Sequence, residues 1–197
     1  MHFWKLAKTL PPIFSPKDIQ KVLNTTLASA KVLCSRYTKQ GRFLKLRRNV
    51  YIFKDLFVHM DQEQLFTLGG LFQDKTYISF ATALAYHGFL KPVPHFIENA
   101  TAKRSLEKQI GYLTWRYHHL PEKAFSSSPE EVVESIASPE KAFLDILYLF
   151  SLGRYYINLK RINLEALNFN KLSHLCTFYP VRTQKLLGKL YGRALNV

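Results

Sequence analysis

The chain has 197 residues, with 28 Lys and Arg against 14 Asp and Glu, which gives a formal net charge of +14 at pH 7. Apolar residues make up 47% of it, a fraction that supports a folded core and excludes a disordered chain. No apolar run approaches the ~18 residues that a membrane span requires, and the first residues lack the features of a signal peptide. We therefore expect a cytoplasmic protein with no membrane partner, whose first partner to consider is a nucleic acid, ahead of an anionic membrane surface.

The positive charge is concentrated at the N-terminus. Residues 1–54 hold 12 Lys and Arg and a single acid, Asp18, a net charge of +11. Residues 55–197 hold 16 Lys and Arg and 13 acids, a net charge of only +3. Charge segregated in this way is typical of a surface that binds a polyanion.

The basic segment contains three predicted helices. The first covers residues 3–10 and ends at Pro11 and Pro12. The second begins at Pro16, after the candidate N-cap Ser15, and ends near residue 23. The third follows a turn at residues 24–26 and runs to residue 40, before Gly41. Its predicted core face, spaced by three and four residues, consists of Leu27, Ala30, Leu33, Cys34 and Tyr37.

A basic β-hairpin is predicted after the third helix, over residues 43–53. Asn49 tolerates the positive φ that a tight hairpin turn requires, so Arg47 and Arg48 should project at the tip. Three helices followed by a basic hairpin predict an N-terminal winged helix-turn-helix domain over residues 1–54. The alternative without a DNA-binding function is a solvated basic surface on an unrelated small domain.

The predicted DNA contacts fall into three groups. Thr25 or Thr26 caps the third helix and offers a phosphate contact through its N-terminus. The outward residues of that helix are expected at or near the bases of a major groove: Ser29, Lys31, Val32 and Arg36. The remaining cations are expected on phosphates or in the minor groove: Lys39, Arg42, Lys45, Arg47 and Arg48.

The rest of the chain mixes helices and strands. Residues 55–75 are predicted to form a helical connector, and residues 76–197 a mixed α/β domain that ends in helices, so that the fold class is α+β. We expect strands at residues 77–78, near 95–101, at 112–118 and at 132–137. Helices are expected at residues 80–87, from residue 138 onward, at about 163–178 and at 180–195.

Catalysis and metal binding have little support in the sequence. His118 and His119 are adjacent, so they face opposite sides of a strand, and no spacing matches a zinc site. Lys141 and Asp145 lie one helical turn apart, which is ordinary helix pairing. We therefore expect no enzyme, no metal and no cofactor. An RNA-stacking sheet is a remaining alternative, with these residues: Tyr112, Trp115, Tyr117, Lys103, Arg104 and Arg116.

Four stretches of the chain form an ordered set of motifs: the hairpin Gly41–Tyr51; Tyr77–Gly88, with Ser79, His87 and Gly88; Trp115–Pro121; and Ile136–Tyr148, with Pro139, Glu140, Lys141 and Asp145. Through this set, nearly the whole chain resembles the AbiEi antitoxins of type IV toxin–antitoxin systems. Asn49 stands where the family usually has glycine.

The resemblance implies an antitoxin that represses its own two-gene operon by binding promoter repeats. It also implies a C-terminal domain that counters a nucleotidyltransferase-like toxin, without need of a stable complex. A solitary winged-helix regulator, or an RNA- or protein-interaction module without a toxin partner, stays open, as does oligomerisation on DNA.

Overall fold

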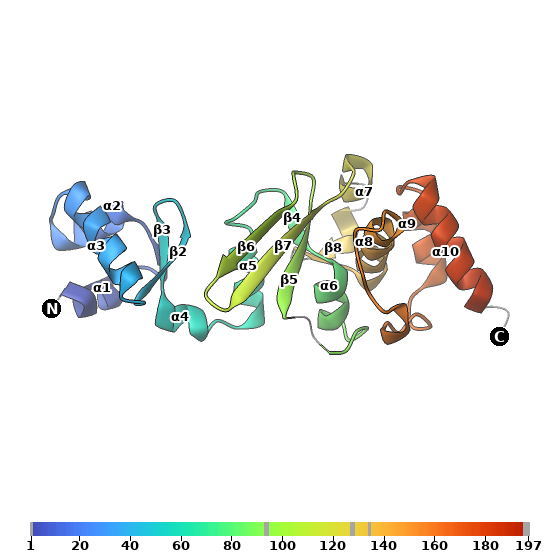
Figure 1. The fold of residues 1–197 in the computed structure, drawn as a ribbon, viewed down its shortest axis with the longest axis horizontal. Coiled ribbons are helices and arrows are strands. Elements are labelled where there is room, and N and C mark those ends of the chain that lie inside the picture. The colour runs from blue at the N-terminus through green and yellow to red at the C-terminus, as the bar shows by residue number, and fades with distance from the viewer. Residues whose placement is uncertain (1, 93–94, 127–128, 134, 195–197) are drawn as a thin grey trace. The chain divides into compact units, whose positions relative to one another are not determined.

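The computed structural model describes residues 2–92, 95–126, 129–133 and 135–194. The chain divides into two compact units (Figure 1). Unit 1 contains residues 1–72 together with residues 110–112, and unit 2 contains residues 73–109 and 113–197. Helices and two separate sheets give an α+β fold, as the sequence predicts.

Unit 1 is built from five helices and a three-stranded sheet. In chain order they are α1 His2–Thr9, β1 Ile13–Phe14, α2 Pro16–Leu23, α3 Leu27–Lys39, β2 Phe43–Arg47, β3 Val50–Phe53, α4 Lys54–Val58 and α5 Gln62–Gly69. The sheet order is β1-β3-β2, with both pairs antiparallel. Figure 1 shows α1, α2 and α3 beside the β2–β3 hairpin. The predicted helices at residues 3–10, 16–23 and 27–40 are confirmed.

An aromatic cluster forms the core of unit 1. Phe43 contacts Phe14, Tyr37 and Phe53 edge to face or nearly so, with ring centroids 4.8–5.2 Å apart. Edge-to-face pairs at such distances are favourable beyond the area they bury. A bulge in β2 between Lys45 and Arg47 shifts the register, so that Leu46 is also fully buried.

In its described residues, unit 2 contains a six-stranded sheet and five α-helices. Its strands are β4 Thr76–Ile78, β5 Phe96–Thr101, β6 Leu106–Ile110, β7 Leu113–His119, β8 Val132–Val133 and β9 Ile136–Ala137. Its helices are α6 Phe80–Tyr86, α7 Glu122–Ser126, α8 Pro139–Ser151, α9 Phe169–Cys176 and α10 Val181–Ala194, with short 3₁₀ turns η1 Pro129–Glu131 and η2 Leu159–Arg161.

The sheet order of unit 2 is β6-β7-β5-β4-β9-β8. Strand β5 is parallel to β7 and antiparallel to β4, which is parallel to β9. Helix α6 packs against β5 and against α8, and α8 also contacts α9 and α10 (Figure 1). Because α8 is covered by helices and by the sheet, almost all of its side chains are buried, including its charged residues near the N-terminus.

Two predicted elements of unit 2 have wrong boundaries, and one strand was missed. The single strand expected at residues 132–137 is two short antiparallel strands, β8 and β9, on either side of residue 134, which lies outside the described residues. The helix expected from residue 163 begins at Phe169, because Asn168 caps it and the preceding residues form a turn. Strand β6 was not anticipated, since as an edge strand it buries only Ile110. The last helix, expected to reach residue 195, is described as far as Ala194.

Both cysteines, Cys34 and Cys176, are free and buried. Across the described parts of the chain, no helix combines the length and apolarity needed to cross a bilayer.

Candidate functional site

The outward face of α3 carries the side chains predicted to approach bases. Lys31, Arg36 and Lys39 are exposed, and 67% of Val32 is exposed although it is apolar. The opposite face is anchored by buried Ala30, Cys34 and Tyr37, in agreement with the predicted core face.

The cap of α3 is Thr26. Its hydroxyl oxygen accepts a hydrogen bond from the Ser29 amide at 3.1 Å, and the hydroxyl donates to Ser29 Oγ at 2.9 Å. Thr25 is half-buried and donates its own amide to the Gln20 carbonyl, so it belongs to the turn before the cap. The cap therefore fixes the N-terminus of α3 and also orients Ser29.

The β2–β3 hairpin turns at Arg48 and Asn49. Asn49 has φ +59°, the positive value that the sequence predicts for the turn. Arg47 and Arg48 are exposed at this tip, and Lys45 is exposed further down β2. These cations stand on a rigid hairpin, whose base is held by Phe43 and Phe53 in the core.

Arg42 occupies a different setting from the hairpin arginines. Its guanidinium lies 4.8 Å from the centre of the Phe3 ring and 5.6 Å from that of Tyr37, while Arg36 lies 5.6 Å from the same Tyr37 ring. Cation–π contacts restrict a long side chain and keep its charge near the protein surface. The end of α3 and the start of β2 thus present two positioned arginines.

The predicted motif of unit 2 forms a buried polar network on α8. Lys141 and Asp145 are 1% and 0% exposed, and Lys141 Nζ lies 2.7 Å from Asp145 Oδ1. The same ammonium donates to Tyr77 Oη at 2.6 Å and to Tyr179 Oη at 2.7 Å. Asp145 also accepts hydrogen bonds from the hydroxyls of Ser79, Tyr77 and Tyr179. Burial, reinforced by the Asp145 charge, raises the pKa of both tyrosines.

Glu140 lies in a second polar group at the start of α8. Its carboxylate accepts the Asn168 amide at 3.1 Å and lies 3.4 Å from Lys171 Nζ. Lys171 also pairs with Glu131 at 2.7 Å, and the Ser138 hydroxyl donates to that carboxylate. This group holds the N-terminus of α8, where Pro139 occupies the first turn, against the cap of α9.

His87 and Gly88 end α6. His87 Nε2 lies 2.9 Å from the Ala137 carbonyl oxygen, and Gly88 has φ +81°. The motif residues of unit 2 therefore join α6, α8 and the sheet, and their contacts are those of a scaffold. Among the described residues, no group of three His, Cys, Asp or Glu side chains is arranged to hold a metal ion.

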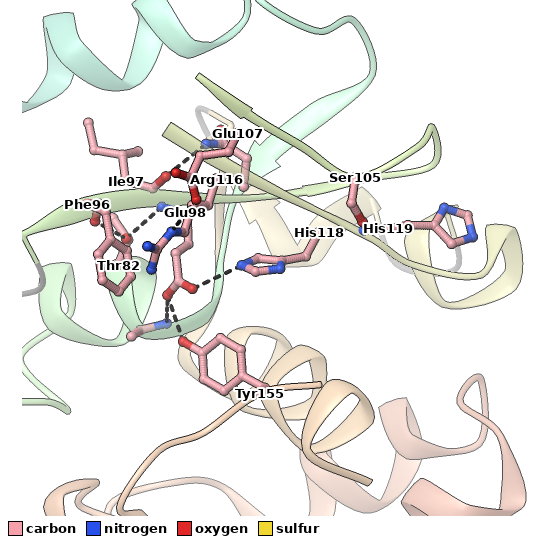
Figure 2. Close-up of polar contacts among 12 residues, drawn as sticks. Thr82, Phe96, Ile97, Glu98, Ser105, Glu107, Arg116, His118, His119 and Tyr155 are labelled. Carbon is pink, nitrogen blue, oxygen red and sulfur yellow. Dashed lines mark hydrogen bonds and ion pairs between the residues drawn. The ribbon is translucent and has the colours of Figure 1, made fainter. Parts of the chain in front are cut away.

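Another buried carboxylate, Glu98, was missed by the sequence analysis. It is 1% exposed, and its Oε1 lies 3.0 Å from His118 Nε2. Its Oε2 accepts the Tyr155 hydroxyl at 2.7 Å and the Ala81 amide at 3.1 Å. Figure 2 shows the carboxylate between the His118 and Tyr155 rings, with His119 directed away. Burial, followed by the Glu98 charge, raises the pKa of Tyr155. A charged residue inside a predicted apolar strand was the signal available in the sequence.

Glu98 lies at a pocket of about 570 Å³ on unit 2. Phe80 lies behind it, with φ +55°, its ring stacked on Tyr155 and edge-to-face with His118. A positive φ is uncommon for a bulky residue and costs about 1–3 kcal/mol. The pocket is lined by Phe96, Glu98, Ser105, Leu106, Glu107, Arg116, Tyr117, His118, Arg154, Tyr155 and Tyr156.

The aromatic residues of β7 do not form a stacking platform. Trp115 is fully buried and Tyr117 is 1% exposed, so neither can offer a ring face to a base. Tyr112 is 65% exposed and belongs to unit 1, where it contacts Phe57. The RNA-stacking alternative loses two of its three rings.

A basic stripe on α10 was also missed. Arg182, Lys185 and Lys189 are exposed at spacings of three and four residues, which places them on one face of the helix. They line one groove with Phe150, Ser151 and Leu186. Residues 146–197 hold 8 Lys and Arg against 1 acid, a net charge of +7, which the average over residues 55–197 conceals.

Comparison with known proteins gives a fold and no family. No protein-family profile matches the chain, and no curated protein matches it. The crystal structure of the RV2827C protein from Mycobacterium tuberculosis is similar, with a TM-score of 0.58 and 13% sequence identity. The match covers 94% of this chain and 73% of the mycobacterial chain. At this identity, the similarity concerns the fold alone.

Proposed function

We propose that this protein binds duplex DNA through a winged helix-turn-helix formed by residues 1–54. The observation that carries the proposal is the outward face of α3, where Lys31, Arg36 and Lys39 are exposed beside an apolar Val32. An exposed valine among these cations suits a major groove, where the thymine methyl group offers an apolar contact.

The hairpin supplies the second part of the proposed interface. Arg47 and Arg48 would contact phosphates or enter the minor groove, while Lys31 and Arg36 would approach base edges. The two sets should therefore differ in what they control. Loss of a hairpin arginine should weaken binding to every sequence, and loss of Arg36 should relax base preference.

A gel-shift titration on the DNA upstream of the protein's own gene tests this proposal. With six or more phosphate contacts, affinity should fall by roughly 10³-fold or more between about 50 and 200 mM salt. The double variant Arg47→Ala/Arg48→Ala should bind all duplexes more weakly and with a shallower salt slope. Lys123→Ala, which removes an exposed cation of unit 2, is the matched control. No binding, or a flat salt response, would refute the proposal.

The antitoxin role is the second part of the proposal, and it is supported by the resemblance to the AbiEi family. The chain would repress its own operon and counter a nucleotidyltransferase-like toxin encoded beside it. To test this role, the chain is co-expressed with the adjacent gene product, and the growth of the host cells is measured. The Arg47→Ala/Arg48→Ala chain should still restore growth when expressed from an unrelated promoter, because the toxin-directed role is assigned to unit 2. A neighbouring gene without a nucleotidyltransferase would favour a solitary regulator.

A further inference from the structure

The pocket beside Glu98 is lined by two acids, Glu98 and Glu107, and two arginines, Arg116 and Arg154. Both oxygens of Glu98 are already bonded, to His118 on one side and to Tyr155 and the Ala81 amide on the other. Glu107 pairs with Arg116 at 2.9 Å. Both acids of the pocket thus have partners within it, whereas one of the two arginines, Arg154, has none among the described residues.

Arg154 is the cation available for an anionic ligand. It is exposed, and among the described residues its guanidinium has no hydrogen bond or ion pair. Two further polar groups line the same pocket. His118 donates its Nε2–H to the Glu98 carboxylate, which leaves Nδ1 of the ring as an acceptor for a ligand hydroxyl. The Ser105 hydroxyl oxygen accepts the His119 amide and keeps its own hydrogen to donate.

The pocket also offers an aromatic surface. Tyr156 is 91% exposed and follows directly after Tyr155, whose ring is fixed by Phe80 and by Glu98. An exposed aromatic side chain beside a free arginine is suited to stacking on a planar ring. The Arg116 guanidinium lies 4.1 Å from the centre of the Phe96 ring, so one face of that ring is already covered. The Tyr156 ring is therefore the aromatic surface of the pocket that a ligand can reach.

We propose that this pocket binds a nucleoside phosphate. Its phosphate would be held by Arg154 and Ser105, a sugar hydroxyl would donate to His118 Nδ1, and its base would stack on Tyr156. A volume of about 570 Å³ lies within the range of pockets that hold small ligands. The proposal involves unit 2 alone and is independent of DNA binding by unit 1.

Isothermal titration of the full-length chain with adenosine monophosphate tests this site, with adenosine and inorganic phosphate as separate arms. The nucleotide should bind, and each fragment should bind at least about tenfold more weakly, a loss of ~1.4 kcal/mol. Arg154→Ala and Tyr156→Ala should each weaken nucleotide binding by a similar factor. Tyr156→Phe should retain it, because the ring face is kept. Lys160→Ala, which removes an exposed cation close by in sequence, should leave it unchanged.

Three results would overturn the proposal. The first is absence of nucleotide binding at millimolar concentration. The second is equal binding of phosphate alone, which would make the pocket a simple anion site. The third is nucleotide binding that survives both alanine substitutions. Because Arg154 and Tyr156 are exposed, their variants should fold, and an unchanged thermal midpoint in the absence of ligand verifies this.

Discussion

Replacement of Asp145 by asparagine should destabilise unit 2 strongly. Lys141 is 1% exposed, so removal of its counter-ion leaves a buried ammonium with neutral oxygens alone, those of Tyr77, Tyr179 and the new amide. Breaking a buried ion pair from one side typically costs about 3–5 kcal/mol, most of which is the penalty for the abandoned charge. Lys141→Met should have a comparable cost, because it strands the Asp145 carboxylate.

The double variant separates charge from packing. Lys141→Met/Asp145→Asn removes both charges and keeps approximate side-chain volumes, so it should be less destabilised than the sum of the single variants, by about 2 kcal/mol. The free energy of unfolding of each variant is measured by urea unfolding, followed by tryptophan fluorescence. Trp4 is 72% exposed in unit 1 and Trp115 is fully buried in unit 2, so a Trp4→Phe background makes the signal specific for unit 2.

The control for this cycle is Glu165→Ala, which removes an exposed acid of unit 2 and should change stability by less than about 0.5 kcal/mol. Single variants that each cost less than about 1 kcal/mol and add without coupling would refute the reasoning. In that case the network would be solvated in solution, and Lys141 would become a candidate for chemistry.

Three other predictions concern local structure. Thr26→Ala should lower the stability of α3 by about 1 kcal/mol through loss of its cap, seen as faster amide exchange in that helix, and Thr26→Ser should preserve it. Hydrogen bonds from Ser15 lower the pKa of Asp18, so its stabilising contribution is complete above the unfolded pKa near 4 and disappears as pH falls through the lower folded pKa. Carbon-13 titration of the Asp18 carboxyl should therefore give a value below that of an ordinary aspartate, and Ser15→Ala should raise it. Burial raises the pKa of Cys34 and of Cys176 to about 11, so iodoacetamide near pH 8 should label them only after denaturation. Rapid labelling of the native chain would contradict this.

The N-terminal elements could be predicted because their signals are local. The prolines after α1, the Ser15 and Pro16 start of α2, and the spacing of apolar residues in α3 all act within one or two helical turns. The positive φ of Asn49 likewise depends only on the hairpin turn. Strand β7 was found because its alternation matches a half-buried strand, with Trp115 inside.

The polar centres of unit 2 could not be predicted, because their partners are distant in sequence. Tyr77 lies 64 residues from Lys141, and Tyr155 lies 57 residues from Glu98. Spacing alone predicted an ordinary helix contact between Lys141 and Asp145. Only the tertiary structure shows that this pair is buried from solvent. The basic stripe of α10 was missed for another reason, since averaging charge over residues 55–197 merged an acidic middle with a basic end.

The burial of the α8 motif changes what the resemblance to AbiEi antitoxins can mean for function. Lys141, Asp145 and Glu140 are at most 7% exposed, and they contact only groups within unit 2. Residues in this position specify how α6, α8 and the sheet pack, so sharing them implies a shared fold more directly than a shared activity.

If unit 2 counters a toxin, the side chains that do so must be accessible to a partner. The accessible chemistry of unit 2 lies elsewhere, at Arg154 and Tyr156 beside the Glu98 pocket and along Arg182, Lys185 and Lys189 of α10. Growth rescue in the co-expression assay should therefore be lost by substitutions at these surfaces in a chain of unchanged stability. Rescue that fails for Lys141→Met alone, with the thermal midpoint preserved, would instead assign the function to the buried network.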